Sequence, residues 1–133
     1  MIHSEIRDLV RRRANSRCEY CLLKQEHSDL SHHVEHITAK QHGGLDEPAN
    51  LALACHRCNL RKGPNLTGID PLTGEVVPLF HPRSDAWGDH FRIDGVRIEG
   101  ITATGRTTVQ VLAINDARRL ELRTELLVQG NFP

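Results

Sequence analysis

The sequence predicts an α+β fold in which a metal-binding half precedes a C-terminal strand-plus-helix extension. Helical periodicity occurs near both ends of the chain, short apolar runs alternate with turn signals between them, and four cysteines form two Cys-x-x-Cys pairs. The 133 residues suit a single domain with a hydrophobic core. We expect residues 1–66 to form the metal-stabilised core with an N-terminal helix, and residues 67–133 to pack on it as an extension.

The first half predicts a helix, a hairpin and a short second helix. Residues 4–15 have helical spacing of apolar side chains and begin with Ser4, a suitable N-cap. Residues 30–38 have an extended character, and the apolar run 51–54 suits the second strand of a hairpin. Residues 55–62 contain no helix breaker and are followed directly by a Gly-Pro pair, which indicates a short helix.

The second half predicts strands followed by helices. Residues 68–74 contain Asp-Pro and Thr-Gly pairs and are predicted to be a turn-rich linker. Residues 76–80 and 91–102 are predicted strands, and the longer run contains an Asp-Gly turn. Thr104 is predicted to cap the first of two C-terminal helices, and residues 116–128 form the second.

Charge is balanced over the chain but segregated along it. The 17 Lys and Arg residues equal the 17 Asp and Glu residues, yet residues 51–63 hold three basic groups and no acid. Such segregation allows a local basic face for a nucleic-acid backbone, although the arginines of residues 11–13 can equally just solvate a helix. No apolar window approaches the ~18 residues of a membrane span, and the charged start lacks a signal-peptide pattern. We therefore expect a cytoplasmic protein without a membrane partner.

The two cysteine pairs indicate a structural Zn²⁺ site formed by Cys18, Cys21, Cys55 and Cys58. Two thiolates separated by two residues reach one ion, and two such pairs complete the tetrahedral coordination of Zn²⁺. A redox pair and ordinary buried thiols are the alternatives. The 33 residues between the pairs exceed the usual zinc-ribbon spacing of about 15–20 residues, so we expect further chemistry in this insert.

The insert and the second cysteine pair carry side chains suited to phosphodiester hydrolysis. His36 is a base that titrates near neutral pH, and Glu35 and Asn59 supply oxygen ligands for a hard divalent cation. On a helix that starts near Cys55, Asn59 and Lys62 share a face, which would bring the lysine to a phosphate. Because side chains alternate along a strand, Glu35 and His36 would point to opposite faces, so we expect the strand to end or distort there.

Residues 18–62 resemble the HNH endonuclease family, a ββα-metal fold, in its four-cysteine, zinc-stabilised, small stand-alone bacterial form. The resemblance lies in an ordered set: Cys-x-x-Cys, Glu-His-Ile, Gly-Gly, Asn-Leu, and a second Cys-x-x-Cys followed by Asn and Lys. It implies that His36 is the general base activating water, and that Glu35 and Asn59 bind a catalytic metal. It also implies that Asn50 positions the hairpin loop and orients the base, and that cleavage leaves a 5′-phosphate and a 3′-hydroxyl.

Two departures from the family pattern bear on the catalytic metal. Position 59 is Asn where the third letter of the family name expects His, and position 35 is Glu where many relatives have Asp. Because an amide oxygen suits Mg²⁺ or Mn²⁺, we expect one of these ions. The expected substrate is DNA, with RNA as the alternative, and the expected nucleic-acid contacts are Lys62, Arg57 and Arg61. We expect a monomer or a homodimer.

Several features leave alternatives open. The second half resembles an extension seen on small bacterial HNH proteins, and residues 80–91 hold three of the five aromatic side chains. These suit a base-stacking platform or an apolar patch that seals the extension to the zinc core. His32 and His33 are either groups that support the metal site or alternative metal ligands, or else solvent-facing strand residues. A non-catalytic zinc-stabilised nucleic-acid-binding module is the alternative function, and a thiol redox protein is a third interpretation.

Overall fold

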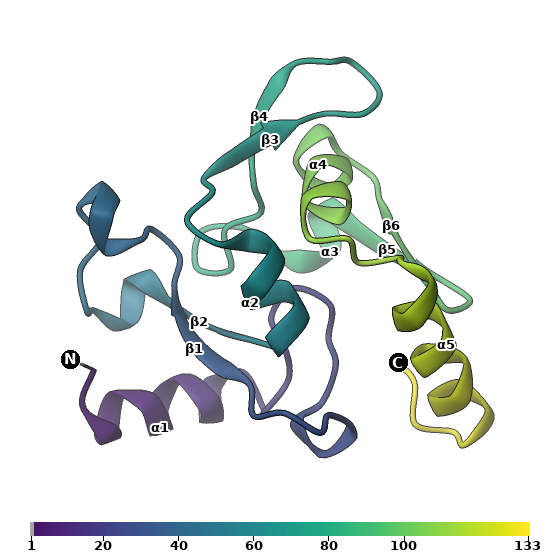
Figure 1. Ribbon diagram of the computed structural model, residues 1–133, viewed down its shortest axis with the longest axis horizontal. Coiled ribbons are helices and arrows are strands. Elements are labelled where there is room, and N and C mark those ends of the chain that lie inside the picture. The colour runs from purple at the N-terminus through teal and green to yellow at the C-terminus, as the bar shows by residue number, and fades with distance from the viewer. Residues whose placement is uncertain (1) are drawn as a thin grey trace. The chain divides into compact units, whose positions relative to one another are not determined.

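The computed structural model describes residues 2–133, which fold into short antiparallel hairpins and helices (Figure 1). The α-helices are α1 (Ser4–Arg13), α2 (His56–Lys62), α3 (Trp87–His90), α4 (Ala103–Val111) and α5 (Ala117–Val128). The strands are β1 (His33–His36), β2 (Leu51–Ala54), β3 (Thr67–Ile69), β4 (Val76–Pro78), β5 (Phe91–Asp94) and β6 (Arg97–Gly100). Among the described residues these strands pair as three two-stranded sheets, β1–β2, β3–β4 and β5–β6. The predicted α+β class is confirmed.

The chain divides into two compact units. The first contains the residues up to Leu66 together with His81–Ala86, and the second contains Thr67–Phe80 and Trp87–Pro133. No sequence signal predicts that residues 81–86 belong with the first unit. The predicted division at residues 66 and 67, and the packing of the extension on the core, stay predictions.

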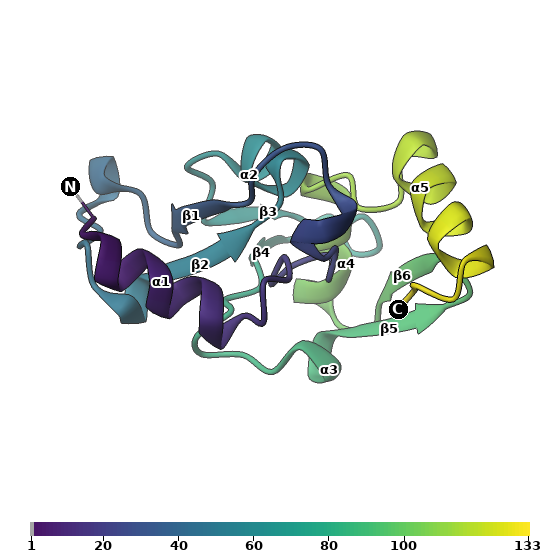
Figure 2. The ribbon, with the colours of Figure 1, turned by 90° about the horizontal axis from the view of Figure 1, so that it is seen from below.

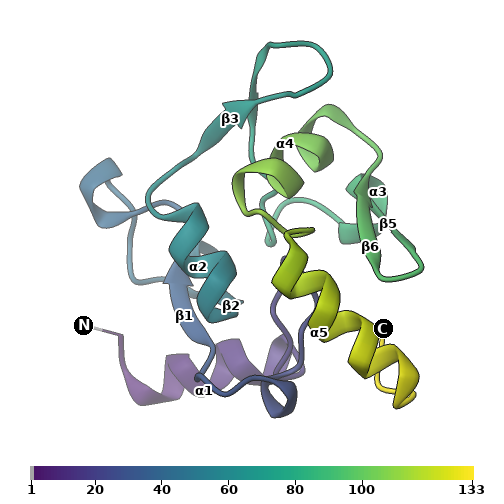
Figure 3. The same ribbon diagram turned by 45° about the vertical axis from the view of Figure 1, so that its right-hand side comes forward.

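The first unit is built around the β1–β2 hairpin. The strands pair in a regular antiparallel register from His33 opposite Ala54 to His36 opposite Leu51. All four residues of β2 are buried, because both α1 and α2 pack on the hairpin (Figures 2 and 3). The apolar face of α1 contributes Val10 to a core cluster with Leu51 and Leu53. This packing places the end of β1 beside helix α2.

The boundaries of the helices in the first unit follow local signals. Helix α1 begins at Ser4 as its first helical residue, with His3 in the cap position, so the predicted Ser4 cap is wrong. Helix α2 is capped by Cys55, whose Sγ accepts a hydrogen bond from the backbone N–H of Cys58 at 3.5 Å. It ends at Gly63, which has a positive φ of 50°. The short helix predicted over residues 55–62 is thus confirmed, and its cap at Cys55 was not predicted.

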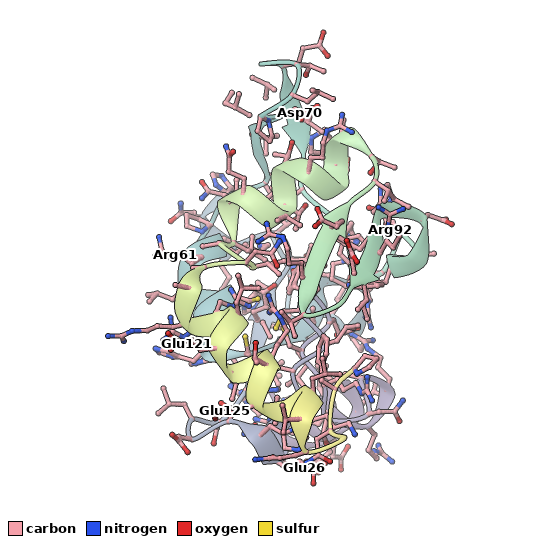
Figure 4. The ribbon with its side chains drawn as sticks, turned by 90° about the vertical axis from the view of Figure 1, so that its right-hand side faces the viewer. Glu26, Arg61, Asp70, Arg92, Glu121 and Glu125 are labelled. Atoms are coloured by element: carbon pink, nitrogen blue, oxygen red, sulfur yellow. The ribbon has the colours of Figure 1, made fainter. Side chains whose placement is uncertain are left out.

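The predicted linker over residues 68–74 is wrong, because this segment belongs to the β3–β4 hairpin. Its turn residues form the hairpin loop, in which the Asp70 carboxylate accepts hydrogen bonds from Leu72 N at 3.0 Å and Thr73 Oγ1 at 3.1 Å. Arg106 on α4 donates two further hydrogen bonds to Asp70, at 3.1 and 2.9 Å (Figure 4 labels Asp70). Asp70 is fully buried by these contacts.

The other strands and helices predicted for the second unit are present, apart from one cap, whereas helix α3 was not predicted. The Asp-Gly turn lies between β5 and β6, with Gly95 at a φ of 62°. Helix α4 is capped by Thr102, whose Oγ1 accepts from Gly105 N at 3.0 Å, whereas Thr104 lies inside the helix. The predicted Thr104 cap is therefore wrong. Helix α5 confirms the predicted helix over residues 116–128, and Asp116, for which no cap role was predicted, is its N-cap.

The aromatic side chains of residues 80–91 pack within the second unit. Phe80 and Phe91 are buried and meet edge to face at a centroid distance of 5.2 Å, and Trp87 lies 5.1 Å from Phe91. Pairs at this distance are typical of apolar cores. The arrangement favours a packing role for these rings over a base-stacking surface.

Candidate functional site

The four cysteines form one buried cluster in the first unit. Their sulfur atoms all lie within 4.8 Å of one another, and the Sγ atoms of Cys21 and Cys55 are 3.6 Å apart. A tetrahedral ion with Zn–S bonds of about 2.3 Å requires sulfur separations of about 3.8 Å. The cluster therefore has the size and the chemistry of a zinc site. Burial is the main cause that raises the pKa of the Cys18 and Cys58 thiols, because it disfavours the charged thiolates. A bound cation would offset this penalty.

Backbone contacts bring the two distant cysteine pairs together. In the first pair, Cys18 Sγ accepts from Cys21 N at 3.4 Å, the turn that lets two thiolates face one ion. Glu19, inside this turn, pairs with Leu53 on β2: its N–H donates to the Leu53 carbonyl and its Oε2 accepts from Leu53 N, both at 2.8 Å. Because β2 leads directly into Cys55, this pairing places the second pair beside the first.

Glu35 points into the first unit and is only 7% exposed. The Tyr20 hydroxyl donates a hydrogen bond to its Oε1, and the Lys62 ammonium lies 4.0 Å from its Oε2. Burial raises the pKa of Glu35, while Lys62, Tyr20 and His36 act in the opposite direction. Tyr20 was not identified from the sequence, where a tyrosine between two metal ligands looks like an ordinary core residue.

Lys62 is 2% exposed, so its surroundings differ from those expected of a phosphate contact. Its Nζ donates to the Ile37 carbonyl at 2.9 Å and faces Glu35. Burial is the larger influence on its pKa and lowers it, and the nearby Glu35 carboxylate opposes this change. The structure thus brings Lys62 and Glu35 together, and contact between Lys62 and nucleic acid stays a prediction.

His36 lies at the end of β1, half-buried, on the other side of the strand from Glu35. Its Nε2 is 2.6 Å from Asp46 Oδ1, and the Lys40 ammonium is 3.1 Å from Asp46 Oδ2. Hydrogen bonds from His36 and Lys40 hold the pKa of Asp46 well below its usual range. Asp46 was not identified from the sequence. The signal available was a carboxylate two residues after the Gly-Gly pair that follows the Glu-His motif.

Asn50 joins the two ends of the loop between β1 and β2. Its Oδ1 accepts from Thr38 N at 2.8 Å, and its Nδ2 donates to the carbonyls of Thr38 and Leu45, both at 3.0 Å. The loop passes so close to itself that a Cβ added to Gly44 would lie 1.7 Å from the Thr38 carbonyl oxygen. These bonds agree with the expectation that Asn50 positions the loop. Its effect on His36 stays a prediction.

The remaining predicted side chains lie on α2 and directly before β1. Asn59 is half-buried and lies one turn before Lys62 on the same side of α2. Lys62 is the residue of this helix that approaches Glu35. Arg57 and Arg61 are exposed (Figure 4 labels Arg61). His32 is buried with Nε2 2.8 Å from the Leu23 carbonyl, so it is a core residue and not a solvent-facing one.

His33 is exposed, as the second of the two alternatives expects, and it has a histidine neighbour on α2. Its Nε2 lies 3.3 Å from Nδ1 of His56. Burial lowers the pKa of His33, and the nearby His56, His32 and Arg11 act in the same direction. The pair connects the start of β1 with the start of α2.

Comparison with known proteins was made for the whole chain. Residues 18–65 match the family model described as HNH endonuclease. The chain is 28% identical over 109 residues to the Septu protein PtuB of Bacillus thuringiensis, an alignment that covers 80% of this chain and 40% of the relative. No solved structure matches the chain. In the described part of the chain, no helix has the length and apolar character needed to cross a membrane.

The matched segment contains the cysteine cluster, the β1–β2 hairpin and α2. A family of this kind implies endonuclease-type activity on a nucleic acid, and a cluster of four buried cysteines suggests zinc binding. Residues 18–65 are thus similar to the HNH endonuclease family, and their ββα core and four-cysteine cluster fit the zinc-stabilised form of that family.

Proposed function

We propose that this chain hydrolyses phosphodiester bonds of DNA, with His36 as the general base. The observation that carries the proposal is the position of Glu35 and His36 at the end of β1, inside the matched HNH segment. Glu35 faces α2, and His36 remains partly accessible with a carboxylate as its partner. Histidine is the side chain that most often acts as a general base toward water.

The side chains proposed to hold the catalytic ion are Glu35 and Asn59. A carboxylate and an amide carbonyl are oxygen donors of the kind that Mg²⁺ and Mn²⁺ prefer, and Glu35 presents its Oε2 toward α2, the helix that carries Asn59. Such an ion would neutralise negative charge that develops on the phosphate. Tyr20 orients the same carboxylate through Oε1, which supports a ligand role for Oε2.

The reaction assigned to the protein side chains is short. His36 removes a proton from a water molecule, the water oxygen attacks phosphorus in line, and the bond to the 3′ oxygen breaks. The departing 3′ oxygen takes a proton from solvent. The products carry a 5′-phosphate and a 3′-hydroxyl. One such site cuts one strand, so a double-strand break would require a dimer or two successive events. Exposed Arg57 and Arg61 are proposed to contact the phosphate backbone.

A plasmid-nicking assay of the zinc-loaded protein with Mg²⁺, with Mn²⁺ or with no added Mg²⁺ or Mn²⁺ tests this proposal. We expect nicking that requires the divalent ion, and we expect His36→Ala to abolish it while zinc content and thermal unfolding stay unchanged. General bases contribute about 10²–10⁴-fold to reaction rates, so the nicking rate of His36→Ala should fall by about this factor. His42→Ala, an exposed histidine of the same loop, is the matched control. Binding to DNA without any metal-dependent nick would favour the non-catalytic binding module.

A further inference from the structure

We propose that Asp46 is a positioning residue that holds the imidazole of His36 with Nε2 protonated, so that Nδ1 is the atom that accepts the proton from water. This inference rests on the proposed function for the role of His36, and on the geometry of the loop for the role of Asp46. Nothing in the family match or in the relative's name assigns Asp46 a part.

The contact itself determines which imidazole nitrogen carries the hydrogen. Asp46 Oδ1 is 2.6 Å from His36 Nε2, the distance of a charge-assisted hydrogen bond. An ionised carboxylate has no hydrogen to donate, so Nε2 must be the donor. In the neutral imidazole the lone pair is then on Nδ1. A base that is held in one tautomer and one ring orientation needs no rearrangement before it accepts a proton.

Asp46 is itself held on both sides. Its second oxygen, Oδ2, is 3.1 Å from the Lys40 ammonium, so the two oxygens of the carboxylate have different partners. The preceding residue, Leu45, has its carbonyl bound by Asn50 Nδ2 at 3.0 Å. The loop that carries Asp46 is therefore tied to the base of the hairpin. Asn50, which the resemblance implies as the residue that orients the base, acts here one step away, by holding the loop that carries Asp46.

The surroundings distinguish this contact from an ordinary surface ion pair. The side chains of His36 and Asp46 are 23% and 27% exposed, whereas that of Lys40 is 57% exposed. The His36–Asp46 contact is thus shielded from most of the solvent that weakens exposed pairs, while the His36 side chain stays partly accessible. If Asp46 merely blocked His36, removing the Asp46 carboxylate would speed cleavage, whereas removal of a positioning residue slows it.

The test compares Asp46→Ala with Glu47→Ala, its exposed neighbour, in the full-length zinc-loaded protein. Long-range ¹H–¹⁵N spectra report the tautomer of each imidazole, and the His36 signals are assigned by their absence from His36→Gln. We expect His36 to be protonated on Nε2 in the wild type and in Glu47→Ala. In Asp46→Ala we expect a mixture of tautomers.

Nicking kinetics give the second readout. We expect kcat of Asp46→Ala to fall about 10–100-fold, a part of the 10²–10⁴-fold that a general base contributes, with KM nearly unchanged. Asp46→Asn should retain more activity than Asp46→Ala, because its amide oxygen can still accept from Nε2. Unchanged or increased kcat in Asp46→Ala would overturn the proposal, as would an Nδ1-protonated His36 in the wild type.

The two readouts separate this proposal from the proposed function. If the wild-type protein shows the Nε2 tautomer, and Asp46→Ala loses it, but no form of the protein nicks DNA, then the nuclease assignment fails while the contact between Asp46 and His36 stands. If the wild-type protein nicks DNA and the tautomer is the same in both proteins, the role of Asp46 is refuted while the nuclease assignment stands.

Discussion

Replacing Cys55 by Ser tests the dependence of the first unit on its metal cluster. Cys55 has two roles, since it offers one of the four clustered thiols and also caps α2 through its Sγ. Serine is among the best N-cap residues, so Cys55→Ser retains a cap and removes a metal ligand. The variant therefore isolates the contribution of the zinc site from that of the helix start.

The size of the effect follows from the small hydrophobic core of this unit. Its buried cluster consists of Ile2, Val10, Leu51 and Leu53. Burying a side chain of this size contributes about 1.5–3 kcal/mol, so these side chains together contribute about 6–12 kcal/mol before the entropy of ordering the chain is subtracted. Structural Zn²⁺ contributes about 10–16 kcal/mol in small domains, against a total domain stability of about 5–15 kcal/mol. Loss of the metal should therefore unfold the unit at 25 °C.

Metal analysis and thermal unfolding followed by circular dichroism measure the outcome. We expect the wild type to hold one zinc ion per chain and to lose its cooperative transition in the first unit when a strong chelator is added. Cys55→Ser should behave like the chelated wild type. Leu60→Ala, which removes a 68% exposed side chain from the same helix, should change neither zinc content nor melting temperature. A Cys55→Ser protein that binds no zinc and melts at the wild-type temperature would refute the argument.

Two further predictions concern buried charges. Lys62→Met should lower the free energy of unfolding by about 3–5 kcal/mol, because it leaves the buried Glu35 carboxylate without its cation. The control Arg61→Met, at an exposed position of the same helix, should change it by less than about 0.5 kcal/mol. An unchanged urea midpoint together with weaker DNA binding would instead make Lys62 a phosphate contact. Hydrogen bonds from Arg106 and the hairpin loop lower the pKa of Asp70 to about 2. The wild type should have a larger free energy of unfolding than Asp70→Asn, and this difference should be fully present above pH 4 and disappear as the pH falls through 2. A difference that is constant from pH 6 to pH 2 would contradict the prediction.

The elements that could be predicted from the sequence are those set by local signals. The apolar run 51–54 is β2 as predicted, and residues 55–62 form a helix whose stop at the Gly-Pro pair is visible in the sequence. The cysteine cluster follows from spacing, because two Cys-x-x-Cys pairs have few alternatives to a common ion. Residues 68–74 show the limit of such signals. Asp-Pro and Thr-Gly pairs occur equally in a linker and in a hairpin loop, and here the partner of the loop, Arg106, is 36 residues away.

The partners of the site residues could not be predicted, since each depends on contact between distant segments. Glu19 binds Leu53 across 34 residues and Arg83 across 64 residues, and neither contact leaves a sequence pattern. The contact between Glu19 and Arg83 also explains why residues 81–86 belong to the first unit. Tyr20 and Asp46 were overlooked for the same reason, because their importance lies only in the side chains that they reach.

The alternation of side chains along β1 explains how this site is divided. The strand stays regular to His36, so Glu35 and His36 lie on opposite sides of it and are supported by different parts of the chain. Tyr20 in the first cysteine turn and Lys62 on α2 surround Glu35, while the loop that carries Asp46 holds His36. If both residues act on one phosphate, that phosphate must lie beyond the end of β1, where the two sides meet. Changes around Glu35 should then alter the divalent-ion requirement, whereas changes around Asp46 should alter kcat at any ion concentration.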